Sequence, residues 1–169
     1  MPADNPACIY CDANVLLAYV GNEVGRVDVV ETLLDEAGHN RIEIITSVLS
    51  IAEVAYGAEE KAAGLTDDGV RRIEKLWVPS SPITLVDVSS ATARGARMLI
   101  RHARQQGLSL RSVDALHLAS AMQFGATTIF TYETQKLASW ALITGLVVTE
   151  PTVVNAQLDF GPPGSTPPG

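Results

Sequence analysis

Carboxylates that stand alone in apolar segments are the side chains of this sequence best suited to chemistry. Asp12 is the only formal charge between positions 5 and 22, within the run YCDANVLLAY. Three further acids have similar surroundings: Glu53 in SVLSIAEVAYGA, Asp114 in SVDALHLASAMQFG, and Glu133 directly after the apolar segment that ends at Tyr132. A buried lone acid costs desolvation free energy unless a partner compensates it, so the four acids predict a common partner.

The partner that such a set predicts is a divalent cation. Clustered carboxylates repel one another and therefore need positive charge between them. Hard oxygen ligands without His or Cys companions favour Mg²⁺ or Mn²⁺ over zinc. Taken singly, each acid also has a structural alternative: an Asx turn for Asp12, a capping box with Ser50 for Glu53, and a helix N-terminus for Asp114 and Glu133.

Short β-like runs alternate with longer helical runs, and these elements must position the acids. We expect strands at residues 8–11, 42–46, 83–86, 127–130 and 146–149. We expect helices at residues 26–38, 48–63, 67–77, 90–107, 112–124 and 134–144. Such alternation predicts right-handed crossovers and a parallel sheet covered on both faces. The expected fold class is α/β, a three-layer α/β/α sandwich with a central parallel sheet of about five strands.

The expected elements place all four acids at one edge of that sheet. Asp12 follows the first strand, and Glu133 follows the fourth. Asp114 lies in the first turn of its helix, and Glu53 lies in the second turn of the helix after the second strand. Ligand sites in open parallel sheets form beyond the carboxyl ends of the strands, so we expect one shared site there.

One domain accounts for almost the whole chain. Residues 1–155 hold every expected element, and residues 156–169 form a Pro/Gly-rich tail that we expect to be flexible. No stretch approaches the roughly 18 consecutive apolar residues of a membrane span. The N-terminus also lacks the basic and apolar regions of a signal peptide, so we expect a cytoplasmic protein with no membrane segment. Cys8 and Cys11 fall on opposite faces of a strand, which argues against a shared metal.

Four segments together resemble the PIN-domain nucleases, and most closely the VapC-like ribonuclease toxins of type II bacterial toxin–antitoxin pairs. The segments are Y-x-D-x-N-V-L at 10–16, the Glu of SIAEV, D-A-L-H-L-A-S-A at 114–121 and T-x-E at 131–133. They occur in the family's order over about residues 8–150. The resemblance implies a PIN-like fold, a Mg²⁺- or Mn²⁺-dependent acidic site and endonucleolytic cleavage of single-stranded or looped RNA. It also implies a homodimer and a cognate antitoxin that covers the active edge.

The resemblance assigns roles to six residues by matching position. Asp12 and Asp114 would be direct metal ligands, Glu53 would hold the metal or its water, and Glu133 would complete a second metal site. All four acids are thereby predicted to be catalytic. Asn14 and Thr131 match polar positions that orient the carboxylates and the substrate. The family more often has Asp at the position of Glu133, and the longer side chain puts the second metal in question.

A stripe of arginines is the candidate contact for the RNA backbone. It consists of Arg94, Arg97, Arg101 and Arg104, followed by Arg111. The first four recur at spacings of three, four and three, so they lie along one side of a helix. Arg111 stands three residues before Asp114. We expect this stripe to guide RNA toward the metals, and the alternative is a solvated helix face with some ion pairs.

His117 follows Asp114 by one helical turn and suggests an acid–base catalyst. A packed, hydrogen-bonded histidine on the same helix is the interpretation that we favour. The structural surroundings of this ring therefore discriminate between the two interpretations.

Charge and motif details limit the function classes. The 12 basic and 19 acidic residues give a net charge of −7, whereas phosphate contacts usually need a basic surface. Two bound divalent cations would offset about four of those charges. A D-x-D phosphate-transferring hydrolase is disfavoured because position 14 is Asn, and a receiver domain because no acid pair precedes Asp87. The remaining alternative is a noncatalytic PIN-fold RNA-binding or scaffold protein.

Overall fold

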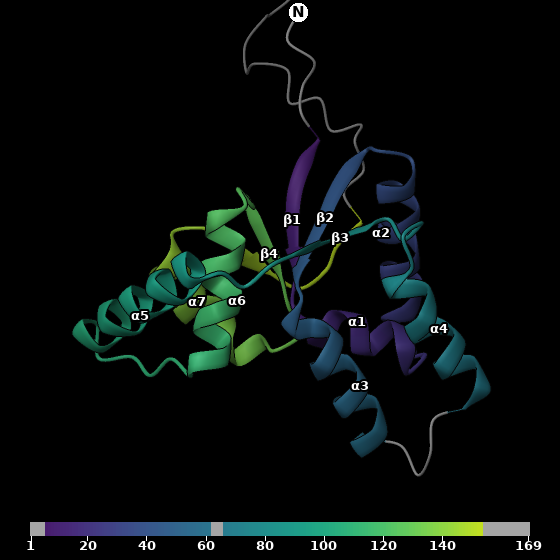
Figure 1. Cartoon of the computed structure of the whole chain (residues 1–169), viewed down its shortest axis with the longest axis horizontal. Coiled ribbons are helices and arrows are strands. Elements are labelled where there is room, and N and C mark those ends of the chain that lie inside the picture. Colours follow the sequence, from purple (N-terminus) through teal and green to yellow (C-terminus); the bar gives the residue numbers. More distant parts are fainter. Residues whose placement is uncertain (1–5, 62–65, 154–169) are drawn as a thin grey trace, which may run out of the picture.

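The chain folds, in a computed structural model, around a parallel sheet of five strands (Figure 1). The structure describes residues 6–61 and 66–153. The strands are β1 (Ala7–Cys11), β2 (Ile42–Ser47), β3 (Ile83–Val86), β4 (Thr128–Phe130) and β5 (Val147–Thr149). They pair in the order β3-β2-β1-β4-β5, with every neighbouring pair parallel, so β1 lies at the centre. The five expected strands are confirmed.

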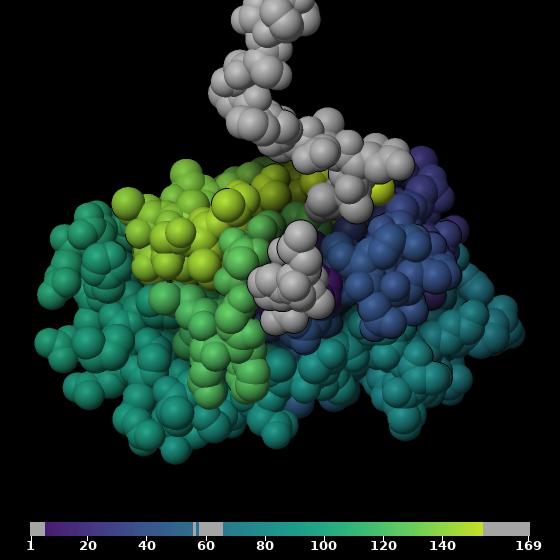
Figure 2. All heavy atoms as spheres, turned by 90° about the horizontal axis from the view of Figure 1, so that it is seen from above, coloured from purple at the N-terminus to yellow at the C-terminus, as the bar shows by residue number. Residues whose placement is uncertain are grey.

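Helices connect consecutive strands and form the two outer layers. They are α1 (Ala13–Val20), α2 (Val27–Gly38), α3 (Leu49–Lys61), α4 (Asp67–Trp77), α5 (Ser90–Gln105), α6 (Ser112–Gln123), the 3-10 turn η1 (Thr134–Lys136) and α7 (Leu137–Thr144). Figure 1 shows α5, α6 and α7 on one side of the sheet and α1 to α4 on the other. Seen from the edge where β1 begins, α5 and α2 lie at opposite ends of the molecule (Figure 2). The predicted three-layer sandwich is confirmed.

Alternation along the strands divides the apolar core into two clusters, one on each face of the sheet. Ile9 and Cys11 pack with α1 to α4, whereas Tyr10 between them packs with α5, α6 and α7. Cys8 packs on the Tyr10 face, and both cysteines are free. The two cysteines therefore face opposite sides of the sheet, as their spacing predicts.

Helix α1 was not predicted from the sequence. Six of its eight residues are buried, so the helix is apolar almost all round and shows no amphipathic period. It begins directly after β1, with Asp12 as its N-cap. The side chain of Asp12 accepts a hydrogen bond from the backbone N–H of Ala13, which holds the start of α1 against the end of β1.

The helix expected at residues 134–144 is divided in the structure. Its first three residues form the 3-10 turn η1, and α7 begins at Leu137. The residue numbers of the other expected helices agree with the structure to within a few positions at each end. The only other difference in element count is therefore the additional α1.

The expected domain boundary at residue 155 stays a prediction, because the tail at residues 156–169 lies outside the described residues. Among the helices that the structure describes, none is both long enough and apolar enough to cross a membrane. The described chain up to residue 153 belongs to one sheet with its two helical layers.

Candidate active site

The carboxyl edge of the sheet carries a pocket of about 230 Å³. Its lining residues are Asp12, Ala13, Asn14, Leu17, Glu53, Asp114, Glu133 and Lys136. The structure therefore gathers the four predicted acids around one space, although they come from distant parts of the chain. In Figure 1 this edge lies below the sheet, where α1, α3 and the start of α6 approach one another.

Asp12 is the most constrained of the four acids. Its side chain is buried, and its residue is only 6% exposed. Oδ1 accepts the Ala13 N–H at 2.9 Å, and Oδ2 accepts the amide of Asn14 at 2.6 Å and the hydroxyl of Thr131 at 3.0 Å. Burial raises the pKa of Asp12 above its ordinary value, and the nearby donors and charges offset only part of that effect. A carboxylate held in this way gains from a cation beside it.

Asn14 and Thr131 connect the beginning of α1 to the end of β4. The Asn14 amide nitrogen also lies 2.9 Å from Thr131 Oγ1, and Asn14 Oδ1 accepts the backbone N–H of Tyr132 at 2.8 Å. The Thr131 hydroxyl oxygen in turn accepts the backbone N–H of Glu133 at 3.2 Å. Both residues therefore hold an acid or the backbone next to one, in line with the orienting role that the resemblance implies.

Glu53 enters the pocket from the second turn of α3. This helix begins at Leu49, so Glu53 is too far along it for a capping box with Ser50. Ser50 instead places its hydroxyl 2.7 Å from that of Thr46. The capping-box alternative for Glu53 is therefore wrong.

His117 ties Glu53 to the core. Its Nε2 lies 2.6 Å from Glu53 Oε2, and its Nδ1 lies 2.6 Å from the hydroxyl of Tyr10, which also accepts the Ser47 N–H at 3.1 Å. Burial disfavours the charged ring, but the bond to Glu53 and the charge of Asp12 outweigh it and raise the pKa of His117. The interpretation of His117 as a packed, hydrogen-bonded histidine is confirmed.

Lys136 joins Asp114 to Glu133, and the sequence interpretation did not include it. Its Nζ lies 3.1 Å from Asp114 Oδ1 and 2.5 Å from Glu133 Oε2. Burial works against the charged ammonium, but the two carboxylates outweigh it and raise the pKa of Lys136. The available signal was its position three residues after Glu133, within the first turn that follows β4.

The arginine stripe lies beside the acid pocket rather than in it. Arg97, Arg101 and Arg104 line a groove of about 490 Å³, together with Ser112 and Leu116 of α6. Asp114 is two residues away from both Ser112 and Leu116. Two residues correspond to about half a helical turn, so Asp114 lies on the other side of α6 from the groove. The groove and the acid pocket therefore flank the first turns of α6.

The remaining two arginines of the stripe differ from those three. Arg94 is not among the residues that line the groove. Arg111 lies at the N-cap of α6, with its Nε 4.0 Å from Asp114 Oδ2, and its side chain is exposed. Within the described residues Arg111 alone of the five pairs with an acid, and the other four are exposed, so the stripe is as compatible with a solvated helix face as with an RNA contact.

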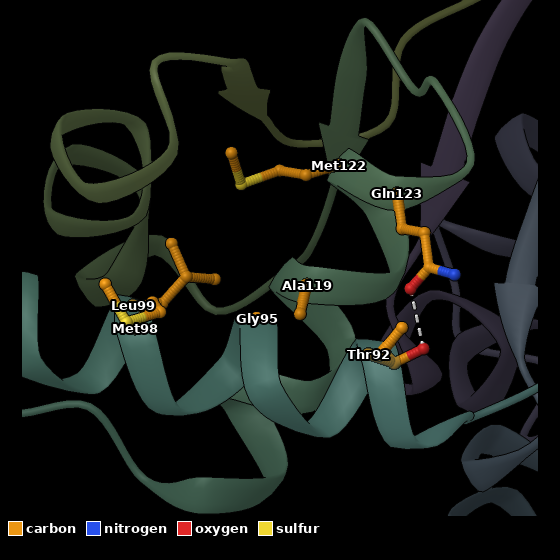
Figure 3. A pocket seen from close by; sticks show the side chains of 8 residues that line it. Thr92, Gly95, Met98, Leu99, Ala119, Met122 and Gln123 are labelled. Atoms are coloured by element: carbon orange, nitrogen blue, oxygen red, sulfur yellow. Dashed lines mark hydrogen bonds between the residues drawn. The ribbon is translucent and has the colours of Figure 1, made fainter.

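A larger pocket on α5 and α6 contains none of the predicted site residues (Figure 3). It measures about 530 Å³, and its lining comprises Ala91, Thr92, Gly95, Met98, Leu99, Ala119, Met122 and Gln123. The Thr92 hydroxyl donates to Gln123 Oε1 at 2.7 Å across one end of it. The other side chains that Figure 3 labels are apolar, so this pocket is an apolar surface and not a second chemical site.

The donor set of the acid pocket fits a hard divalent cation. Its ligand atoms are carboxylate oxygens, and Asp12 is buried with an uncompensated preference for the neutral form. In the described parts of the chain, no three His, Cys, Asp or Glu side chains gather closely enough to hold a metal ion as they stand. Side chains such as Glu53, which is half-exposed, would have to move inward for a cation to bind.

Comparisons with solved structures give the same fold. VapBC2 from Rickettsia felis, bound to a DNA fragment from its promoter, is similar with a TM-score of 0.62 and 19% identity over 85% of this chain and 98% of that chain. A toxin–antitoxin complex from Klebsiella pneumoniae is similar with a TM-score of 0.57 and 19% identity, over 85% of this chain and 98% of that chain. VapC20 from Mycobacterium tuberculosis, a toxin that cleaves the sarcin–ricin loop, has a TM-score of 0.58 and 15% identity, over 78% of this chain and 94% of that chain.

The sequence comparisons identify the family. No curated protein matches the chain. The PIN domain family matches residues 9–139, a range that includes all four acids, Asn14, Thr131 and Lys136. With this match and the observed fold, the chain belongs to the PIN domain family.

Proposed function

We propose that this protein is a Mg²⁺- or Mn²⁺-dependent endoribonuclease that hydrolyses RNA phosphodiester bonds. The observation that carries the proposal is the pocket in which Asp12, Glu53, Asp114 and Glu133 meet. Membership of the PIN domain family supports a nuclease at the level of the family. The cytoplasm, where RNA is abundant, is the compartment that goes with this proposal.

The chain's own residues hold and orient the acids in this proposal. Asp12, Glu53 and Asp114 would bind the cation, and Asn14 and Thr131 keep the carboxylate of Asp12 in place. A divalent ion in such a site neutralises phosphate charge and supplies hydroxide near neutral pH. The buried position of Asp12 keeps bulk water away from that side of the site, which strengthens the electrostatic interactions there.

RNA is the substrate that we favour, although the net charge of −7 opposes nucleic-acid binding in general. The arginine groove between α5 and α6 supplies local positive charge, with Arg111 at the turn between groove and acids. We propose that Arg97, Arg101 and Arg104 hold phosphates upstream or downstream of the cut, and Arg111 guides the strand toward Asp114. The sarcin–ricin loop specificity of VapC20, a protein of the same fold, supports RNA over DNA.

We propose that the protein is the toxin of a toxin–antitoxin pair, a role that the same neighbours support. VapBC2 and the Klebsiella complex are similar in fold and contain both partners of such pairs, which supports a cognate antitoxin for this chain. We also propose a homodimer. The apolar pocket of Figure 3, where Met98 is 59% exposed and Met122 is 44% exposed, is the surface that supports it.

The second candidate is a noncatalytic PIN-fold RNA-binding or scaffold protein. It is favoured by the spacing of the four acids, which do not converge as closely as a metal requires. The presence of all four acids around one pocket at the carboxyl edge argues against it, since a scaffold has no need to bring four like charges together. We therefore favour the nuclease.

Metal-dependent cleavage of a structured RNA pool by the purified protein tests the proposal. The arms are Mg²⁺, Mn²⁺ and EDTA, with Asp114→Asn as the control for contaminating ribonucleases. We expect cleavage that needs metal and disappears in the variant. Cleavage retained by Asp114→Asn would contradict the proposal, and the absence of both cleavage and calorimetric Mn²⁺ binding would favour the scaffold.

A further inference from the structure

Lys136 makes the acid pocket a mixed site of four carboxylates and one ammonium. Its Nζ bridges Asp114 Oδ1 at 3.1 Å and Glu133 Oε2 at 2.5 Å. The same nitrogen lies 5.0 Å from the centroid of the Trp140 ring, within the range of a cation–π interaction. The side chain is only 16% exposed. Two carboxylates and one aromatic ring therefore lie close to the ammonium.

The local backbone explains why the ammonium takes this place. Glu133 is the N-cap residue of η1, and Lys136 is its last residue, so the two side chains are three apart on one helical turn. Lys136 is also the N-cap residue of α7, which places Trp140 four residues further along the helix. The buried Trp140 fixes one side of the lysine stem, since its residue is only 2% exposed.

Charge determines how many divalent ions this pocket accommodates. The four carboxylates carry −4 and the ammonium carries +1. One divalent cation brings the pocket to −1, whereas a second would bring it to +1. A second cation between Asp114 and Glu133 would also contact the ammonium directly, and like charges at that separation repel strongly in a partly buried site.

We propose that Lys136 is the pocket's resident second cation, so that this protein binds one divalent ion, held by Asp12, Glu53 and Asp114, while the ammonium neutralises Glu133. The inference rests on the proposed function, because it assumes that the acid pocket binds a metal at all. The inference adds the number of bound ions to the proposed function and gives Glu133 a partner within the chain.

The free oxygen atoms agree with this division. Among the described residues, Asp114 uses Oδ1 for Lys136, and Glu53 uses Oε2 for His117. Glu53 Oε1 and Asp114 Oδ2 accept no hydrogen bond there, and the exposed Arg111 approaches Asp114 Oδ2 only to 4.0 Å, so an ion in the pocket can bind both oxygens. Glu133 Oε2 instead has two partners within the chain, the ammonium of Lys136 and the amide of Gln135.

The ammonium also retains a donor for the substrate. An ammonium has three N–H groups, and Asp114 and Glu133 accept two of them. The third is available to a phosphate oxygen, where a positive charge stabilises the charge that develops during hydrolysis. Lys136 is in this view a substrate-contacting residue in addition to a counter-ion.

The test is the stoichiometry of Mn²⁺ binding to the full-length protein, measured by calorimetry and by electron paramagnetic resonance without RNA. We expect one ion per chain for the wild type and two for Lys136→Met. Lys75→Met is the matched control, since it removes the same charge from an exposed position on α4 and should leave one ion bound. Lys136→Arg keeps the charge and should also bind one ion.

Circular dichroism and thermal unfolding establish that each variant is folded, and Lys136→Gln replaces Lys136→Met if the latter is not. Two ions on the wild type, or a single ion on both neutral variants, would overturn the role of Lys136 and leave the nuclease proposal standing. No Mn²⁺ on any of the proteins would instead remove the metal centre, and the inference with it. The two failures are therefore distinguishable.

Discussion

Nε2 of His117 lies 2.6 Å from Oε2 of Glu53, and this contact joins the buried core to the acid pocket. The other ring nitrogen faces the hydroxyl of Tyr10 at 2.6 Å. That hydroxyl already accepts the Ser47 N–H, and burial raises the pKa of Tyr10 so that it keeps its proton. The Tyr10 hydroxyl can therefore donate a hydrogen bond to Nδ1 of His117. The neutral ring then carries its hydrogen on Nε2 and donates it to Glu53.

Replacement of His117 tests whether this bond orients Glu53. We expect His117→Leu to weaken Mn²⁺ affinity by about 10- to 100-fold, the usual cost of losing a residue that orients a metal ligand. His117→Gln retains an N–H donor and should recover part of the affinity. Calorimetric titration of both variants with Mn²⁺ provides the measurement, and equal affinities for Leu and wild type would contradict the orienting role.

Removal of the Tyr10 hydroxyl should destabilise the fold itself. Tyr10→Phe leaves the Ser47 N–H and His117 Nδ1 without a partner in the core, at a cost of about 1–3 kcal/mol in the free energy of unfolding. Tyr132→Phe is the control, since the Tyr132 hydroxyl makes no hydrogen bond within the described residues. Urea unfolding compares the two, and similar losses for both variants would argue against the buried network.

The raised pKa of Asp12 predicts a pH dependence of the metal-free protein. The folded chain holds the Asp12 proton more tightly than the unfolded chain does, so the free energy of unfolding falls as pH rises from about 3.8 through the raised pKa. The decrease in the free energy of unfolding is complete above the raised pKa of Asp12 and persists at neutral pH. Asp12→Asn does not titrate at this position.

Urea unfolding in EDTA across this pH range, with wild type and Asp12→Asn side by side, isolates the contribution of Asp12. The wild type should lose stability relative to the variant as the pH rises. A stability difference that stays constant over the range would show that burial does not perturb Asp12. The comparison cancels the titration of groups that the two proteins share.

Mn²⁺ should restore the stability that the carboxylates lose to repulsion. A ligand that binds only the folded state stabilises it by about 2.7 kcal/mol at a concentration 100 times its Kd. We therefore expect saturating Mn²⁺ to raise the thermal midpoint of the wild type and EDTA to reverse the change. Asp114→Asn should respond weakly, and a full response in that variant would place the ion elsewhere.

The arginine groove predicts a specific change in salt dependence. Each lost phosphate contact should reduce the slope of log affinity against log salt by about 1, so Arg97→Ala/Arg101→Ala should lower it by about 2. Arg94→Ala/Arg71→Ala removes the same charge from outside the groove. Fluorescence anisotropy with a structured RNA at several salt concentrations measures the slope for both double variants. Equal slopes for the two variants would show that the groove does not contact the RNA.

The sheet and the positions of the acids follow from patterns that the sequence displays openly. Strands such as residues 42–47 are short and rich in β-branched residues, and the carboxyl ends of parallel strands meet at one edge. The acids after those strands must therefore be neighbours in space. The match to the PIN domain family over residues 9–139 agrees with this inference.

Helix α1 and the role of Lys136 depend on information that the pattern lacks. An almost uniformly apolar helix has no period of 3.6 residues to distinguish it from a buried strand. The reach of Lys136 to Asp114, 22 residues earlier, depends on how α7 packs against α6. Contacts between side chains on different helices follow from packing angles, and packing angles are not visible in local residue spacing.

The hydrogen bond from Thr131 to Asp12 spans 119 residues of sequence, and it has a consequence for synthesis on the ribosome. Asp12 is made first, but Thr131, which helps to orient it, and the partner acids at 114 and 133 are added only later in translation. The nascent chain therefore carries isolated acids without a pocket. The pocket can therefore begin to act only after Glu133 has been translated.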